Sequence, residues 1–512
     1  MGKNTTKSLG RILLSLSSLV ILSKLLGFAR NIVMADAFGA SIETDLVTLA
    51  HTLVTNTEYV ITQTLATAFV PVYLSVQNDH PKFNKTYFSS CAIKLFLLIA
   101  VALSLIITAC APLIAKIIAP TYSGELSVQL THYIRLLAPI LIPFVLLSVF
   151  KSLLNAHEKY IPGEMVSIIG STVIITLIFL LSSKIGINAI LLGIWLSSVI
   201  SAVFLAVFSK RYWTLRSGNP FQNEKIIVLL KMVAPLLFGY AMVFINQQID
   251  KIIVSGMAEG TVTAMSYGNN ISQLVVTLIA SFCMVMYTRL SIGAVEGAHE
   301  QNAGFIVQTL SVVITILIPV TIISVICSRD IVKIIFEHGA FDSKATANAS
   351  YALSGYGLMF IPYTIKSLFS RYLYSNQNTK QPVRNNTIGI LSNIILSLAL
   401  YKLLGVFGVT FASSFAELVA GILNIRSSKQ INSYLNFQPW KANAKYWLIG
   451  TLLCTAVVSI CRQFLLPAAN SIVRLFVCVI LGLLFYFLSC FPIIRGILQT
   501  VFHKKSADPF IF

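Results

Sequence analysis

The stretch Ser-Lys-Leu-Leu-Gly-Phe-Ala-Arg at residues 23–30 places two cations inside the first long apolar run of the chain, 12–38. Inserting one Lys or Arg at mid-bilayer costs about 2.5–3.5 kcal/mol, so two in one run indicate a function. A helix turns about 100° per residue, which separates Lys24 and Arg30 by about 120° around its axis, and Gly27 allows a bend. We interpret this helix as one wall of a positively charged, water-filled cavity within the membrane. The alternative is that the two side chains extend to the lipid headgroups near a helix end.

The rest of the chain has the composition of a polytopic membrane protein. Of its 512 residues, 56% are hydrophobic and 11% are charged, whereas about 25% of the residues of a soluble domain are charged. We therefore predict an all-α fold with about fourteen transmembrane helices, each long enough to cross a hydrocarbon core of roughly 30 Å. The apolar segments are 12–38, 45–74, 87–119, 126–154, 165–183, 189–208, 226–254, 262–292, 305–336, 351–374, 387–404, 406–425, 447–466 and 472–494.

The net charge of +19 is distributed unevenly between the loops. Loops 120–125 and 258–261 carry almost no basic residue, whereas the loops between them in the alternation are basic. This is the positive-inside pattern and not a nucleic-acid footprint, so we expect both termini in the cytoplasm. The basic residues are Lys3, Lys7, Arg11, Lys82, Lys85, Lys159, Lys210, Arg211, Arg216, Lys225, Lys380, Arg384, Lys429, Lys441, Lys445, Lys504 and Lys505.

A short internal repeat divides the chain. The motif Ile142-Pro143-Phe144, followed by Ser148 and Phe150, recurs 219 residues later as Ile361-Pro362-Tyr363 with Ser367 and Phe369. Six predicted spans separate the copies, so both halves have the same orientation, and such parallel repeats bind substrate between the halves. We predict two six-helix lobes, 1–210 and 225–428, followed by a C-terminal helix pair at 440–512.

Several chemistries lack their motifs. The eight cysteines form no Cys-x-x-Cys pair, which makes a metal site through them improbable, and the first apolar run is too long for a cleaved signal peptide. There is no Gly-x-x-x-x-Gly-Lys-Ser/Thr loop and no His-Glu-x-x-His motif or nucleophile elbow. We predict a transporter, not an enzyme, that depends on an ion gradient, the membrane potential or the consumption of its substrate.

Few charges remain inside the predicted spans, and such charges usually face a bundle interior or a cavity. Asp45 and Glu58 are placed to neutralise part of Lys24 and Arg30, and Lys366 lies near mid-span beside the repeated Ile-Pro pair. Arg135, Lys251 and Arg371 are consistent either with the cavity or with anchoring at the membrane interface, and we expect His51 and His132 to be structural.

Several motifs resemble those of the MurJ (MviN) family of lipid II flippases, within the wider multidrug/oligosaccharidyl-lipid/polysaccharide exporter superfamily. The resemblance covers spans one to twelve. It implies fourteen spans, alternating access, a bacterial plasma membrane location, and a cationic central cavity that binds a pyrophosphate-linked glycolipid. The residues that carry it are 23–30, Phe38-Gly39-Ala40, Thr44-Asp45, Ala68-Phe69-Val70-Pro71, 336–341 and 374–383.

The resemblance also assigns roles to single residues. Lys24 and Arg30 match the two basic residues of the family's first span, and Asp45 matches its acidic residue at the start of the second. Many members carry further arginines in span two and span eight, where this chain has Glu58 within 53–59 and Asn269-Asn270. The implied substrate-binding set is Lys24, Arg30, Asp45, Glu58, Asn269, Asn270 and Lys366.

A cation site also has a precedent in the family, between spans seven, eleven and twelve. Asp250, Asn393, Ser397 and Thr410 offer oxygen ligands that suit Na⁺, and Asn393 and Ser397 share a helix face. Polar contacts between packed helices are the alternative interpretation of these residues.

We expect a flippase for an undecaprenyl-pyrophosphate-linked saccharide, foremost lipid II. The alternatives are a flippase for an exopolysaccharide lipid intermediate, a cation-coupled drug exporter, and a membrane scaffold. Organic cations favour an acidic cavity, whereas Lys24, Arg30 and Lys366 favour an anionic substrate. The expected partners are the lipid-linked saccharide and membrane lipids, without nucleic acid, and the expected state is a monomer, with Na⁺ or the membrane potential as driving force.

Overall fold

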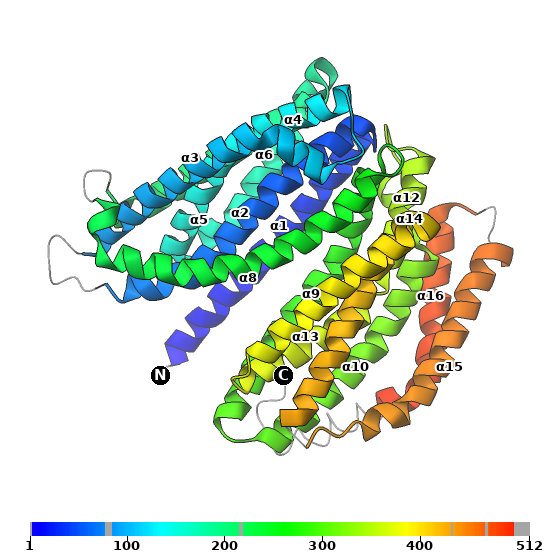
Figure 1. Ribbon diagram of the computed structural model, residues 1–512. Coiled ribbons are helices and arrows are strands. Elements are labelled where there is room, and N and C mark those ends of the chain that lie inside the picture. Colours follow the sequence, from blue (N-terminus) through cyan, green and yellow to red (C-terminus); the bar gives the residue numbers. More distant parts are fainter. Residues whose placement is uncertain (1–2, 77–83, 215–218, 432–433, 466–468, 496–512) are drawn as a thin grey trace. The chain divides into compact units, whose positions relative to one another are not determined.

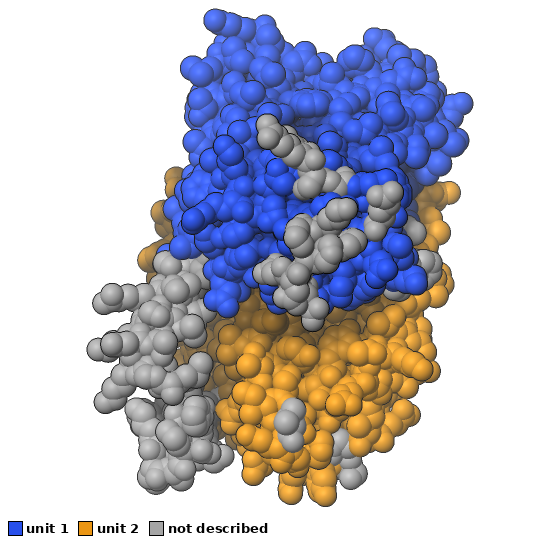
Figure 2. Space-filling view, turned by 90° about the vertical axis from the view of Figure 1, so that its left-hand side faces the viewer, with its two compact units in different colours: residues 1–263, 338–341 blue, residues 264–337, 342–512 orange. Residues whose placement is uncertain are grey.

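The computed structural model describes residues 3–76, 84–214, 219–431, 434–465 and 469–495, which are helical or lie in short connections. The all-α prediction is confirmed for this part of the chain. Lys82, Arg216, Lys504 and Lys505, which the loop-charge pattern uses, lie outside it. The chain forms two compact units: Met1–Thr263 with His338–Phe341, and Ala264–Glu337 with Asp342–Phe512 (Figure 2).

Unit 1 is built around α2 (Ile42–Leu74), which packs on α4 (Glu125–Leu137), α5 (Leu141–Ala156) and α8 (Glu224–Ser255) (Figure 1). Its core consists of apolar side chains from α2, α3, α5, α7 and α8, among them the fully buried Phe69 and Phe88. The remaining helices of the unit are α1 (Lys3–Phe38), α3 (Lys85–Ile118), α6 (Ile161–Ile185) and α7 (Asn188–Ser209).

Unit 2 contains most of α9 (Thr261–Val295) and the helices that follow it. Its core joins α9, α10 and α13 to α15 and α16, which lie side by side in Figure 1. The other helices are α10 (His299–Ile326), α11 (Ser328–Phe336), α12 (Ser343–Gly357), α13 (Phe360–Ser375), α14 (Lys380–Ile431), α15 (Gln438–Ile460) and α16 (Ser471–Ser489).

Ten of the described helices are long and apolar enough to span a membrane. One of them, α14, bends at Gly405, where φ is 57°, and so contains two of the segments predicted from the sequence. The pair α12–α13 is interrupted, and α2 and α8, which carry several polar side chains, are not among the ten. The polytopic fold is thus confirmed, while the count of fourteen spans stays a prediction.

The two units divide at a different place from the two predicted lobes. Helix α8 packs on α2 and α3 and belongs, with the first residues of α9, to unit 1. The lobes 1–210 and 225–428 describe an internal repeat, whereas the units describe packing, so the lobe boundaries stay a prediction. The C-terminal helices α15 and α16 pack on α10 within unit 2.

The backbone repeats at the offset seen in the sequence. Helices α5 (Leu141–Ala156) and α13 (Phe360–Ser375) begin and end 219 residues apart, and each follows a break in the preceding helix. Glu158 and Gln377, at the same offset, are the two non-glycine residues with positive φ in the described chain, at 58° and 59°. Gly186 and Gly405 both have φ of 57°. The repeat therefore extends well beyond the short motif that revealed it.

Candidate functional site

Helix α1 carries the two cations that opened the sequence analysis. It packs along α6, and Gly27 faces Ser171 of that helix: a Cβ at this glycine would lie 4.0 Å from the Ser171 hydroxyl. Lys24 is exposed, whereas Arg30 is half-buried and donates from Nη2 to Asn31 Oδ1 at 3.4 Å. The structure thus gives the two cations different surroundings on one helix.

Arg30 lies in a polar cluster made by three helices of unit 1. His51 of α2 is within electrostatic reach of both Arg30 of α1 and Lys251 of α8. The Lys251 ammonium donates to the Thr52 hydroxyl at 2.5 Å. Lys251, which the sequence left open as an interfacial anchor, therefore faces α2, and it adds a cation beside Arg30.

Asp45 holds the start of another helix. Its side chain is almost fully buried, and Oδ1 accepts from the backbone N–H of Thr263 at 2.8 Å, near the N-terminus of α9. The first N–H groups of a helix lack partners within it, and a carboxylate there is favourable to the helix dipole. Asp45 thus has a structural contact in this conformation, and its part in substrate binding stays a prediction.

Glu58 belongs to a separate polar chain on α2. Its Oε1 accepts from the Thr62 hydroxyl at 2.6 Å, and Thr62 forms a short hydrogen bond with Ser148 of α5. One turn beyond Ser148, the Lys151 ammonium lies 3.1 Å from Glu164 Oε1 of α6. Glu58 is therefore linked to α5 through hydroxyl groups, and Lys151 is already paired.

The two asparagines of the substrate set lie on α9 in unit 2, both half-buried. Asn269 Oδ1 accepts from Gln273 Nε2 at 3.3 Å. The preceding Gly268 permits a close crossing with α12, because a Cβ there would lie 2.5 Å from the Ala349 carbonyl oxygen.

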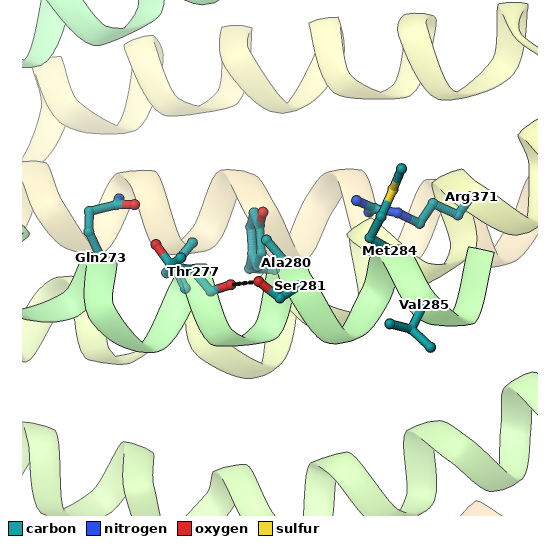
Figure 3. Close-up of a pocket in the computed structure, with 9 residues that line it drawn as sticks. Gln273, Thr277, Ala280, Ser281, Met284, Val285 and Arg371 are labelled. Atoms are coloured by element: carbon teal, nitrogen blue, oxygen red, sulfur yellow. Dashed lines mark hydrogen bonds between the residues drawn. The ribbon is translucent and has the colours of Figure 1, made fainter. Parts of the chain in front are cut away.

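A groove of about 650 Å³ lies beside α9 in unit 2 (Figure 3). Polar side chains follow one face of α9 at Gln273, Thr277 and Ser281, and Arg371 extends from α13 towards Met284. Arg371 Nη1 forms a short hydrogen bond with the hydroxyl of Ser367, which holds the base of its side chain. The full lining is Gln273, Val276, Thr277, Ala280, Ser281, Met284, Val285, Tyr363 and Arg371.

Lys366 forms an ion pair with a residue that the sequence analysis did not single out. Its ammonium lies 2.7 Å and 2.8 Å from the two carboxylate oxygens of Glu417 on α14. The side chains of the pair are 19% and 21% exposed, so they are accessible without being solvated. Lys366 also lies 5.3 Å from the centre of the Tyr363 ring, which lines the groove.

Three residues of the candidate cation site are fully buried in unit 2. Ser397 donates to Asn393 Oδ1 at 3.2 Å, whereas the Thr410 hydroxyl donates to the Val406 carbonyl of its own helix at 3.0 Å. Ser413 reaches Asn393 Oδ1 at 3.5 Å. Asp250 belongs to unit 1. Within the described chain, His, Cys, Asp and Glu side chains form no cluster of three suited to a metal.

Sequence reasoning missed three charged positions and had signals for two of them. Glu417 interrupts an apolar run at 406–425, which alone marks it as unusual. Gln273, Thr277 and Ser281 recur every four residues, which indicates one polar helix face next to Arg371. No comparable signal separated Lys251 from an interfacial anchor, because only tertiary packing places it against Thr52.

These observations define a multi-span helical membrane protein that keeps charged side chains inside its helical bundle, as transporters do. The sequence profile of the family described as "Lipid II flippase MurJ" matches residues 34–481. This is most of the chain, and the chain belongs to that family. The resemblance seen in residues 23–30 and the other motifs is thereby confirmed.

Individual relatives agree with this assignment. The chain is 23% identical over 420 residues to the probable lipid II flippase MurJ of Treponema pallidum, with 79% of each chain covered. It is 24% identical over 464 residues to the probable lipid II flippase MurJ of Rickettsia prowazekii, covering 87% of this chain and 88% of the relative.

Solved structures share the fold. A lipid II flippase MurJ in an inward closed conformation matches with a TM-score of 0.79 and 24% identity, covering 94% of this chain and 99% of that one. An inward-facing multidrug resistance transporter of the MATE family matches with a TM-score of 0.64 and 15% identity, covering 81% and 95%. At these identities the likeness concerns the fold alone.

Proposed function

We propose that this chain is a flippase that moves lipid II from the cytoplasmic to the outer leaflet of the membrane by alternating access. The observation that carries the proposal is the family match over residues 34–481. The charges inside the helices support it, because a diphosphate with about two negative charges needs compensating cations within the membrane. Lys24, Arg30 and Lys251 in unit 1, and Lys366 and Arg371 in unit 2, are such cations.

The same charges make a drug exporter a poor alternative. A protein that binds organic cations needs acidic side chains at its site. In unit 1, Asp45 contacts the backbone of α9, and in unit 2 Glu417 is paired with Lys366. We infer an anionic substrate, and the likeness to the MATE transporter remains one of fold.

The groove beside α9 extends the proposed binding set. Arg371 lies where a phosphate is held best by a guanidinium, which offers several donors in a fixed plane. The hydroxyl and amide groups of Gln273, Thr277 and Ser281 suit the hydrogen-bonding groups of a sugar. We propose that this groove contacts the headgroup, together with Asn269, which already bonds Gln273.

We also propose a location in the bacterial inner membrane with both termini cytoplasmic, and a monomeric state. The alternation of basic loops supports the orientation. A reporter fused after Phe512 that requires the cytoplasm should be active, and a reporter that works only outside the cell should be silent.

The driving force is proposed to be the membrane potential or Na⁺. Asn393 and Ser397, with Asp250, would hold Na⁺ through hard oxygen ligands, and the hydroxyl of Ser413 fits this set better than that of Thr410, which is bonded to its own helix. A bound Na⁺ would supply a positive charge that links the ion gradient to the transport cycle. Transport into proteoliposomes with and without a Na⁺ gradient, at fixed potential, tests this.

Complementation tests the function itself. A bacterial strain depleted of its own lipid II flippase should grow when it expresses this chain. Purified protein in liposomes should then expose lipid II on the opposite leaflet. Growth rescue that fails despite good expression, together with transport of another lipid-linked saccharide, would assign the chain to the exopolysaccharide alternative.

A further inference from the structure

The Lys366–Glu417 ion pair is unusual in its position. Both carboxylate oxygens lie within 2.8 Å of the ammonium, and each side chain is about one-fifth exposed. A charged side chain that loses its partner inside a membrane protein is costly. Lys366 therefore requires an anion near it at every stage of a transport cycle.

The pair is not what holds its two helices together. Gly421, one turn beyond Glu417, lets α14 approach α13 so closely that a Cβ would lie 3.4 Å from the Lys366 backbone nitrogen. Asn424 donates to the Ser370 hydroxyl at 2.8 Å and to the Lys366 carbonyl at 3.3 Å. The backbone at Lys366 is thus fixed by other contacts, which leaves its long side chain free to exchange partners.

The pair lies next to the groove. The Tyr363 ring contacts the groove on one side and lies 5.3 Å from the Lys366 ammonium. Tyr363 is also within electrostatic reach of Glu417 and Arg371. An anionic group bound at Arg371 therefore enters the field of Lys366, and it competes with Glu417 for the ammonium.

We propose that Glu417 is an internal substitute for the anionic group of the substrate, which occupies Lys366 while the groove is empty and is displaced when a diphosphate binds. This inference rests on the proposed function and adds to it a self-competing carboxylate. Glu417 lowers substrate affinity by competition. It also neutralises Lys366 in the empty protein, so that the empty protein returns without an uncompensated charge inside the bundle.

The competition gives Glu417→Gln a specific signature. Inorganic pyrophosphate should bind the purified full chain about two- to fivefold more tightly, the range expected when a partly exposed ion pair no longer competes. In liposomes the concentration of lipid II at half-maximal rate should fall, and the maximal rate should fall as well, because the return of the empty protein is slowed. A purely structural pair gives no gain in affinity.

Three variants serve as controls. The double variant Lys366→Met, Glu417→Gln should bind pyrophosphate no more tightly than the wild type, because the gain requires Lys366. Glu417→Asp, which keeps the charge on a shorter side chain, should lie between wild type and Glu417→Gln, and it provides the test if Glu417→Gln does not fold. Glu337→Gln removes the partner of Lys333, at 3.3 Å in a more exposed pair, and should change neither constant.

The outcomes separate the two proposals. A wild-type protein that moves no lipid II refutes the proposed function. A wild-type protein that moves lipid II, with folded Glu417→Gln and Glu417→Asp variants whose pyrophosphate affinities equal that of the wild type, refutes the competition by Glu417 alone.

Discussion

Single side chains in this chain serve the fold as well as transport, and Asp45 is the clearest case. It matches an acidic position of the family, yet its carboxylate accepts a hydrogen bond from the Thr263 N–H at 2.8 Å and is almost fully buried. A capping acceptor of this kind contributes to the stability of the helix start whether or not substrate is present. Stability and transport therefore have to be measured separately for such residues.

We expect Asp45→Ala to destabilise the folded protein by about 0.5–2 kcal/mol, the usual cost of losing a capping acceptor. Asp45→Asn keeps an oxygen at the same place and should lose less. Thermal unfolding of the purified variants, followed by tryptophan fluorescence, measures this. Equal melting temperatures for Asp45→Ala and the wild type would show that the contact with Thr263 contributes nothing.

Helix pairs in unit 2 depend on close backbone approach. Gly268 of α9 crosses α12 so tightly that an added Cβ would lie 2.5 Å from the Ala349 carbonyl oxygen and 2.8 Å from the Ala352 Cβ. The neighbouring Asn269 is thereby held in place to bond Gln273 at the groove. Packing between these two helices and the polar face of the groove are therefore coupled through adjacent residues.

Gly268→Ala should destabilise the protein by about 1–3 kcal/mol, the usual cost of overpacking. Gly304 of α10 provides the matched control, because a Cβ there has no atom of the described chain within 4 Å. Gly304→Ala should leave stability unchanged or raise it by up to about 1 kcal/mol through helix propensity. If both substitutions shift the melting temperature alike, the crossing is looser than the structure shows.

An aromatic stack closes the connection between α5 and α6. The His157 ring lies 3.7 Å from the Tyr212 ring, centre to centre, and its Nε2 is 2.7 Å from the Tyr73 hydroxyl. Burial, together with the charges of Lys85 and Lys159, lowers the pKa of His157 below its ordinary value. The folded state therefore favours the neutral imidazole.

This shift predicts a pH dependence of stability. Unfolded histidine takes up a proton near pH 6.5, whereas folded His157 does so only at lower pH, so the unfolded state binds more protons in between. Stability should fall as the pH falls below about 6.5. The melting temperature of His157→Gln should decline less than that of the wild type between about pH 7.5 and 5.5. Parallel declines would assign the effect to other groups.

At the scale of the whole molecule, the sequence predicted the class and the repeat better than the contacts. Apolar segments and loop charges predicted the polytopic helical fold, and the Ile-Pro motifs lie in two helices whose ends repeat at the same offset of 219 residues. Side-chain partners were not predictable in this way. Lys366 was singled out, but its partner Glu417 is 51 residues away on another helix, and only packing brings them together.

The same limit applies to the unit boundary and the cation candidates. Hydropathy cannot tell which neighbour a membrane helix packs on, so the placement of α8 with α2 and α3 in unit 1 had no sequence signal. Thr410 and Ser413 both follow a plausible helix spacing, and only the structure shows that Ser413 reaches Asn393. Helix periodicity identifies a face, but it does not identify the atoms that the face contacts.

The central claim is that cations inside the bundle bind the diphosphate of a lipid-linked saccharide, and the double variant Lys24→Ala, Arg30→Ala tests it most directly. We would measure lipid II flipping by the purified, folded variant in liposomes, with Lys24→Arg as the charge-conserving control. Losing a hydrogen bond to a charged group costs about 1.5–3 kcal/mol, so the double variant should be slower than the wild type by about tenfold or more, while Lys24→Arg remains active. Flipping at the wild-type rate by a well-expressed double variant would contradict the claim and would show that both side chains only anchor α1 at the headgroups.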